Sequence, residues 1–355
     1  MPSQCHPAAA SNDTASSSLP NLISVLQSSR EDKELHWLVS SMIMPEFERI
    51  LETLQICGNM LLYNSPQHPD PEKRIERGPS IKLPVSSNKS EALKGIIVRN
   101  GIYITQLTLN LKDSYFNKHI HRINLNQPVL LPQLITAKES IDSAMLLIQN
   151  FNEDQNHSDL KRSFENILHE LSIAKQCLQF PIDPTLVFPL HIVESELFTP
   201  PLPSNLSLDI YINQAELCID MKNLHKITEE PWSHIDPESG KSYVDKVRDE
   251  MRNPTNGTTT PLNLSDVHLK DEDPAPHHSA LKALGQLLKP KMSPQEYITK
   301  CVTYNNSVVM VNRKIDVSCP DPLLVSTYTK LDSLENIVES FLHNLKVACA
   351  HDLPA

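Results

Sequence analysis

Histidine side chains are the first residues of this 355-residue chain that could carry chemistry. His119 and His121 are two positions apart, so on a strand both point to one face and could share a metal ion. His277 and His278 are adjacent, and no cysteine or third histidine lies near them in the sequence. Since neither pair has an indicated third ligand, we interpret them as exposed strand and loop histidines, and we predict no metal site.

Acidic pairs are the second candidate, for general acid and base catalysis. Glu194 and Glu196 lie in a proline-rich stretch with no aromatic platform for a sugar nearby. The nucleophile-elbow motif GxSxG and the zinc-peptidase motif HExxH are both absent from the sequence. The sequence therefore predicts that the protein is not an enzyme and needs no cofactor. A hydrolase with an unrecognised site is the remaining enzymatic alternative, and it requires a deep polar pocket.

Glycine is too scarce for a phosphate-binding loop. The chain has 7 glycines, whereas average composition gives about 25. The only neighbouring pair is Gly95 and Gly101, which are one residue too far apart for the Walker spacing, and Ile102 follows where lysine is needed. These counts exclude P-loop and Rossmann nucleotide binding.

Charge and cysteine usage limit the partners and the compartment. The formal net charge is −11, and no basic run exceeds a dipeptide, so we expect no nucleic acid partner. No stretch approaches the 18 apolar residues of a membrane span, and the first residues lack the basic and apolar regions of a secretory signal. The 7 cysteines are dispersed without a CxxC pair, which is typical of reduced cytosolic thiols.

Helical periodicity predicts four main helices. Apolar residues three or four apart predict a helix over 31–63, in which Pro45 either kinks the helix or starts a second one. Further helices are predicted over 135–151, over 159–178 and after Pro322. The apolar stripe of 159–178 is interpreted as bundle core, because a self-standing coiled coil needs three or four heptads. The predicted stripe of the first helix is Leu35, Leu38, Met42, Phe47, Ile50, Leu54, Cys57 and Leu61.

Alternation of apolar and polar residues predicts the strands. Asn100-Gly101 and Asn213-Gln214 are expected to form the turns of two hairpins. The predicted strands cover 81–85, 94–99, 102–111, 118–125, 206–213, 217–224, 297–303 and 308–317.

The order of these elements predicts an α+β fold, in which an elongated helical bundle joins an antiparallel β-sheet domain. The two groups of strands are expected to share one sheet. The predicted bundle comprises 31–64, 133–180 and 320–350, and the predicted sheet domain comprises 80–126, 204–226 and 297–318.

Three segments are predicted to lie outside that body. Residues 1–30 are rich in serine, alanine and asparagine, so we expect a disordered tail. The prolines of 181–203 predict a rigid connector, and 228–296 is expected to be a largely disordered insertion. Within the insertion, 280–289 is predicted to form a short amphipathic helix that packs back on the body or docks on a partner or membrane. Its apolar face carries Leu281, Leu284 and Leu288.

The stretch 197–227 resembles the signature region of the Rogdi family. In that family a Phe-x-Pro-x-Leu-Pro-Ser connector leads into a strand ending Val/Ile-Tyr-Ile-Asn, and a second strand with Leu-Cys and a Leu-His end follows. Glu34, Trp37 and Leu38 also match the opening of the family's first helix, and we interpret Trp37 and Phe198 as core anchors. The matching residues are Phe198, Pro200, Leu202, Pro203, Ser204, Ile210, Tyr211, Ile212, Asn213, Leu217, Cys218, Leu224 and His225.

The resemblance points to the fungal branch of the family, the small subunit of the RAVE complex. It implies a non-catalytic scaffold that promotes assembly of the vacuolar-type proton ATPase by rejoining its peripheral and membrane sectors. The implied partners are a large β-propeller-containing subunit, the peripheral ATPase sector and, indirectly, a cullin-ligase adaptor. The implied location is the cytoplasm, with peripheral recruitment to vacuolar or endosomal membranes. The alternative is a helical-bundle adaptor or tether in membrane trafficking, which 280–289 would anchor.

Overall fold

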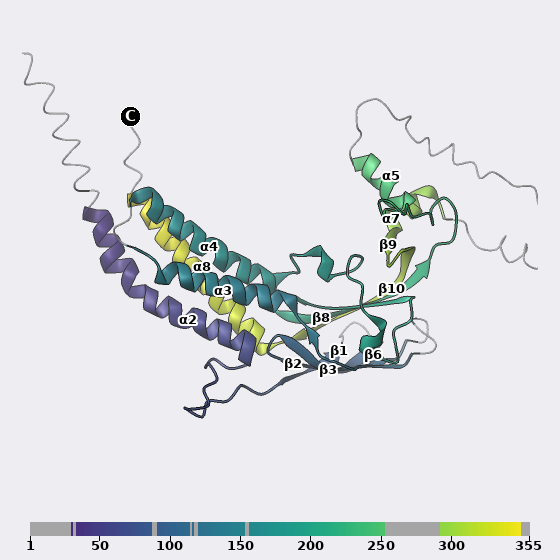
Figure 1. Cartoon of the computed structure of the whole chain (residues 1–355), viewed down its shortest axis with the longest axis horizontal. Coiled ribbons are helices and arrows are strands. Elements are labelled where there is room, and N and C mark those ends of the chain that lie inside the picture. The colour runs from purple at the N-terminus through teal and green to yellow at the C-terminus, as the bar shows by residue number, and fades with distance from the viewer. Residues whose placement is uncertain are drawn as a thin grey trace, which may run out of the picture.

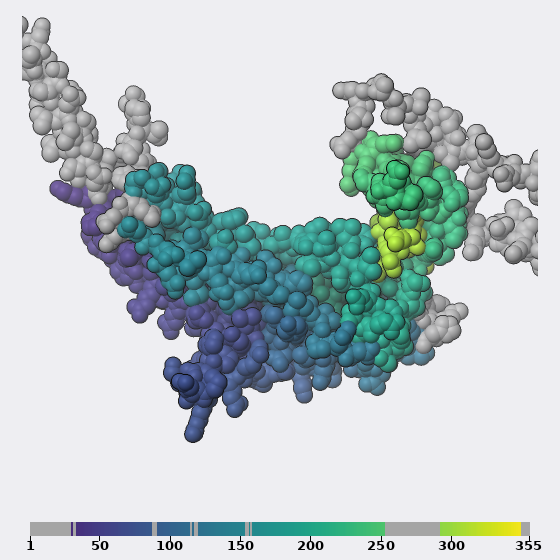
Figure 2. All heavy atoms as spheres, viewed as in Figure 1, coloured from purple at the N-terminus to yellow at the C-terminus, as the bar shows by residue number. Residues whose placement is uncertain are grey.

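The computed structural model describes residues 30, 33–86, 91–113, 116, 120–152, 156–252 and 292–348. The chain is of the mixed α and β class, with two antiparallel sheets. Long helices occupy one end of an elongated molecule, the sheets lie in the middle, and a small lobe projects at the other end (Figures 1 and 2). Residues 1–29 of the predicted tail, the amphipathic helix 280–289 with its three leucines, and His119, His277 and His278 lie outside the described residues.

Four long helices pack side by side (Figure 1). Helix α3 contacts both α2 and α4, and α8 also contacts both α2 and α4, so the four enclose a common apolar core. The stripe of α4 is buried there, which confirms its interpretation as core. Pro45 lies in the first turn of α2, directly after the π-helical turn η1, so the helical run continues through it. The helices are η1 (Leu38–Ile43), α2 (Met44–Tyr63), α3 (Pro132–Gln149), α4 (His157–Gln179), α5 (Tyr243–Arg252), α7 (Pro294–Lys300) and α8 (Pro322–Ala348), with 3-10 turns η2 (Pro184–Leu186) and η3 (Ser195–Leu197).

The π-helical turn η1 corrects the predicted apolar stripe of the first helix. A π-helix bonds residue i to i+5 and so places more residues in each turn than an α-helix. The buried side chains here are consequently four apart, at Val39, Ile43 and Phe47. Trp37, which we predicted in the core, is 58% exposed, and Met42 is 52% exposed. Both predictions were wrong because they assumed an unbroken α-helical period.

The strands form two sheets, whereas we expected one. The first sheet has the order β1-β2-β3-β4-β6, with β5 paired to β3, and the second has the order β7-β8-β10-β9. Pro200, Pro201 and Pro203 follow β6, and since proline cannot donate to a ladder, pairing stops there and β7 pairs with β8. The strands are β1 (Ile81–Ser86), β2 (Leu93–Asn100), β3 (Tyr103–Leu111), β4 (Arg122–Leu125), β5 (Val129–Leu130), β6 (Phe198–Thr199), β7 (Leu206–Asn213), β8 (Glu216–Lys226), β9 (Cys301–Tyr304) and β10 (Ser307–Pro320).

Two tight hairpins set the strand register. Gly101 has φ +60° in the turn between β2 and β3, and a Cβ there would lie 2.3 Å from the backbone oxygen of Leu62, so the turn requires glycine. The turn between β7 and β8 consists of Gln214 (φ 53°) and Ala215 (φ 58°), one residue later than predicted. Two positive φ angles are typical of a type I′ turn, whose twist matches that of paired strands.

Part of the segment 228–296, which we expected to be largely disordered, folds into the small lobe. Trp232 stacks on Tyr297 with ring centroids 4.8 Å apart and planes 3° apart. Helix α5 lies before the undescribed stretch 253–291 and α7 lies after it. Tyr297–Lys300 belongs to α7 and not to the predicted strand. The lobe escaped prediction because its core residues come from separated segments: Ile227, Trp232, Val244, Val247, Tyr297, Ile298, Cys301 and Val308.

A capping box holds the start of α7. The Ser293 side chain accepts a hydrogen bond from the N–H of Glu296, and the Glu296 side chain accepts one from the N–H of Ser293. Replacing Ser293 with alanine is expected to cost about 1 kcal/mol locally, so amide exchange in 293–300 should accelerate about fivefold. Hydrogen-exchange mass spectrometry measures this, with Ser293→Thr as the control that keeps the cap. Unchanged exchange in Ser293→Ala would contradict the assigned cap.

Candidate functional site

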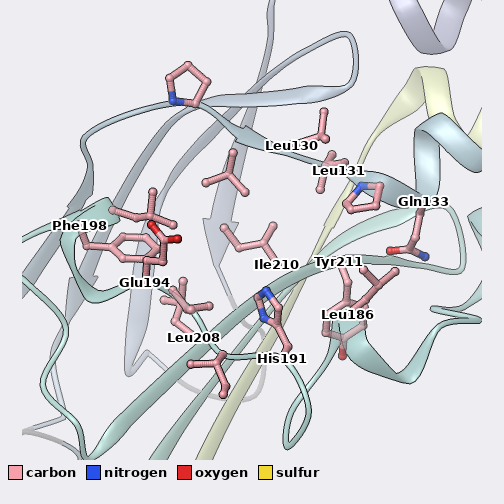
Figure 3. Close-up of a pocket in the computed structure, with 16 residues that line it drawn as sticks. Leu130, Leu131, Gln133, Leu186, His191, Glu194, Phe198, Leu208, Ile210 and Tyr211 are labelled. Atoms are coloured by element: carbon pink, nitrogen blue, oxygen red, sulfur yellow. The ribbon is translucent and has the colours of Figure 1, made fainter. Parts of the chain in front are cut away.

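An apolar groove lies where the proline-rich connector crosses the edge of strand β7 (Figure 3). The cavity has a volume of about 390 Å³, within the range of ligand and peptide pockets. One wall is β7 with Leu208 and Ile210, and the opposite wall is Leu130 and Leu131 before α3. Connector residues from 186 to 198 form the remaining walls.

Asp209 fixes the connector to the sheet. Its side chain is 0% exposed and accepts the backbone N–H of Phe188 at 3.2 Å. Asp209 Oδ1 lies 2.8 Å from His191 Nδ1, and an ionised carboxylate only accepts, so this ring nitrogen carries the proton. The pair aligns His191 as part of the groove wall.

The ammonium group of Lys222 balances the buried negative charge of Asp209 and is shared with Asp220. Lys222 Nζ lies 3.2 Å from Asp209 and 2.8 Å from Asp220, and it sits 4.8 Å from the ring centroid of Phe188. Burial, followed by the nearby Asp220 carboxylate, raises the pKa of Tyr211, which keeps its phenol protonated at neutral pH. The connector is thus anchored by charge-assisted hydrogen bonds and a cation–π contact.

Gln133 covers one end of the open edge of β7. Its amide donates to the carbonyl of Ile212 at 2.9 Å and accepts the Ile212 N–H at 2.7 Å. The same amide nitrogen donates to the carbonyl of Cys177 at the end of α4, at 2.8 Å. One buried side chain therefore joins α3, α4 and the edge of the second sheet.

Of the predicted signature residues, Phe198, Ile210 and Tyr211 line this groove. Phe198 is buried, as predicted, and lines the groove together with Tyr211. Leu202 and Cys218 are buried but do not line the groove, while Pro200, Pro203 and Asn213 keep partial or full exposure. Trp37, at the start of the first helix, is exposed and does not line the groove either. Leu281, Leu284 and Leu288, the possible partner contacts, lie outside the described residues.

Several groove residues gave no usable signal in the sequence. In the sequence, Gln133 has the position of an ordinary residue in the first turn of a helix. Asp209 alternates with apolar residues, as a solvent-facing strand residue does. His191 and Leu186 lie in the connector without periodicity. Their roles depend on contacts between segments far apart in the chain, which no local pattern encodes.

The side chains that line the groove favour ligand binding over catalysis. Its lining is mostly aliphatic, and among the described lining residues there is no serine, threonine or cysteine that the His191–Asp209 pair could activate. Over the described ranges, no three histidine, cysteine or acidic side chains approach closely enough to hold a metal ion. No helix in the described part of the chain is long and apolar enough to cross a membrane.

The described cysteines behave as core residues. All five are buried: Cys57, Cys177, Cys218, Cys301 and Cys319. Burial raises the thiol pKa to about 12 in Cys57 and Cys319 and to about 11 in Cys177 and Cys301.

Slow alkylation of these five thiols is the expected result, because the reactive thiolate is scarce when the pKa is raised. Native protein treated with iodoacetamide at pH 8 should leave them unmodified in peptide mass spectra. Unfolding in guanidinium chloride should expose all five to modification. Rapid native labelling of Cys57 would contradict its burial.

The family model described as "Rogdi leucine zipper containing protein" matches residues 34–346. The chain is 26% identical over 327 residues to the "Regulator of V-ATPase in vacuolar membrane protein 2" of Saccharomyces cerevisiae, covering 88% of this chain and 90% of that protein. It is 22% identical over 218 residues to the "Protein rogdi homolog" of Danio rerio, covering 60% and 74% of the two chains. The corresponding Rattus norvegicus protein is 21% identical over 213 residues, covering 59% and 72%.

Proposed function

The chain belongs to the Rogdi leucine zipper family, and from this premise we propose that it is a non-catalytic scaffold subunit of a complex that regulates the vacuolar-type proton ATPase. The observation that carries the proposal is the similarity to the yeast regulator of V-ATPase, which spans 90% of that protein. An apolar groove without an activatable nucleophile in its described lining agrees with a binding role.

The proposed action is assembly, in which the peripheral ATP-hydrolysing sector is rejoined to the membrane sector. The proposed partners are a large β-propeller-containing subunit and the peripheral sector, with a cullin-ligase adaptor bound indirectly. The proposed location is the cytoplasm, with peripheral recruitment to vacuolar or endosomal membranes. The proposed architecture is a helical bundle of α2, α3, α4 and α8 joined to a β domain, which provides separate surfaces for separate partners.

Complementation tests this function. In Saccharomyces cerevisiae cells that lack the relative, expression of the full chain should restore vacuolar acidity, measured with a ratiometric pH dye. A tagged full chain should also recover peripheral ATPase subunits and a large β-propeller subunit from native extracts of its own cells. Recovery of neither would contradict the proposal. Flotation with liposomes that depends on 280–289 would favour the tethering adaptor instead.

A further inference from the structure

We propose that the groove binds an extended segment of a partner protein, which adds to the edge of β7 as a further strand and places a basic residue near Glu194. This inference names a mode of binding, and it does not depend on which complex the chain serves. Four features carry it: the free backbone edge, the Gln133 bonds, the apolar lining and the charge at one end.

The backbone of β7 alternates between two directions. Residues Gln214 and Ala215 form a two-residue turn, so Asn213 and Glu216 form a hydrogen-bonded pair, and so do Tyr211 with Cys218 and the pairs two residues further on. The residues between them turn their N–H and C=O groups away from β8. Leu208 and Ile210 are two such residues, and both line the groove.

Gln133 confirms which way the free edge points. Ile212 has the same orientation as Leu208 and Ile210, and its N–H and C=O bond to the Gln133 amide as they would to a neighbouring strand. Leu208 and Ile210 have no backbone hydrogen bond on this edge to any described residue. Because backbone groups at an enclosed edge need partners, the groove presents a template for an added strand.

The lining selects the side chains of such a strand. Alternate side chains of an added strand point to opposite faces, and those on the groove face meet Leu130, Leu186 and Phe198. Apolar residues at every second position fit these walls, while the intervening residues remain polar. The main chain then contributes affinity, and the apolar pockets contribute specificity.

The charge at one end favours a basic residue. Glu194 lines the groove, at the end away from Gln133 in Figure 3. Both Glu194 and the following Glu196 are exposed, and neither forms an ion pair with any described residue. With a net charge of −11 over the whole chain, electrostatic complementarity favours lysine or arginine in the partner segment.

Peptide selection tests the proposal directly. Random linear heptapeptides displayed on phage are selected on the full chain and counter-selected on its Ile210→Pro variant. We expect enriched peptides that alternate apolar and polar residues and carry lysine or arginine at one end. Failure to enrich any peptide overturns the proposal.

Backbone methylation separates strand addition from simple apolar binding. The best peptide is synthesised with a normal backbone and with N-methyl groups on alternate residues, in both possible phases. One phase should bind about tenfold more weakly, because its main-chain donors to β7 are lost. The normal peptide should also slow amide exchange within 206–213. Equal affinity for all three peptides, or protection elsewhere, overturns the proposal.

The Ile210→Pro variant needs a matched comparison. Proline is tolerated at an edge position whose N–H faces away from the ladder, and Ile210→Ala removes the same side chain while keeping that N–H. Thermal unfolding should show both variants folded, and only Ile210→Pro should lose peptide binding beyond about tenfold. Equal binding by the two variants overturns the role of the backbone edge. Glu194→Lys should separately weaken the selected basic peptides.

Discussion

Replacement of Arg99 by methionine is expected to lower the free energy of unfolding by about 3–5 kcal/mol. The side chains of Arg99 and Asp321 are both 0% exposed, and Arg99 Nε lies 2.6 Å from Asp321 Oδ2. Without Arg99, the Asp321 carboxylate is left buried and uncompensated. A loss of this size is a large share of the stability of an ordinary domain.

The Arg99–Asp321 pair also joins several elements of the fold, which increases its contribution to stability. Arg99 Nη1 donates to the side-chain oxygen of Asn64 at 3.0 Å and to the carbonyl of Gly101 at 2.7 Å. Asn64 ends α2 with φ 55°, and Asp321 accepts the N–H of Leu323 at the start of α8, at 2.9 Å. One guanidinium therefore holds together the end of α2, the β2–β3 hairpin and the start of α8.

Chemical unfolding followed by circular dichroism measures the effect, and a double-mutant cycle isolates it. Asp321→Asn removes the charge but keeps an oxygen to cap α8. The double variant Arg99→Met/Asp321→Asn has no buried charge at these two positions, so it should be at least about 1 kcal/mol more stable than the sum of the single losses indicates. Strict additivity would show that the two side chains do not interact in solution.

Local patterns were sufficient for most of the elements. The helix periods of α3, α4 and α8 and the alternation in β3 and β7 act over neighbouring residues, so the sequence alone predicts their positions closely. The register of the first helix was not predictable, because η1 is stabilised by packing of Val39 and Ile43 and not by any local motif. The division into domains stays a prediction.

The groove and the small lobe depend on distant contacts. Phe198 and Tyr211 stood out because their segment resembles a family signature, and the structure places both in the groove. Gln133 meets Ile212, which is 79 positions away, and Trp232 stacks on Tyr297 across the undescribed stretch. Such contacts join residues far apart in the chain and form only when it has folded, so neither composition nor periodicity predicts them.

Asp209 provides the second large effect, on both stability and the groove. Replacing Asp209 with alanine removes the acceptor for the Phe188 N–H, for His191 and for Lys222. Breaking a buried charge network from one side costs about 3–5 kcal/mol. Lys222 keeps Asp220 as a partner, so the expected cost lies toward the lower end of that range.

The loss of Asp209 should also loosen the connector locally. Without Asp209, the segment 183–197 loses the hydrogen bonds from Phe188 and His191 to β7, so its amide exchange and proteolysis should accelerate more than those of α3 or α8. His191→Ala is the matched control, since it removes only the part-exposed bond and should cost no more than about 1.5–3 kcal/mol. If Asp209→Ala unfolds at the wild-type denaturant concentration and leaves 183–197 protected, the network does not anchor the connector. If instead the connector is released in a folded variant, peptide binding at β7 should fall with it, because His191 and Leu186 are walls of the same groove.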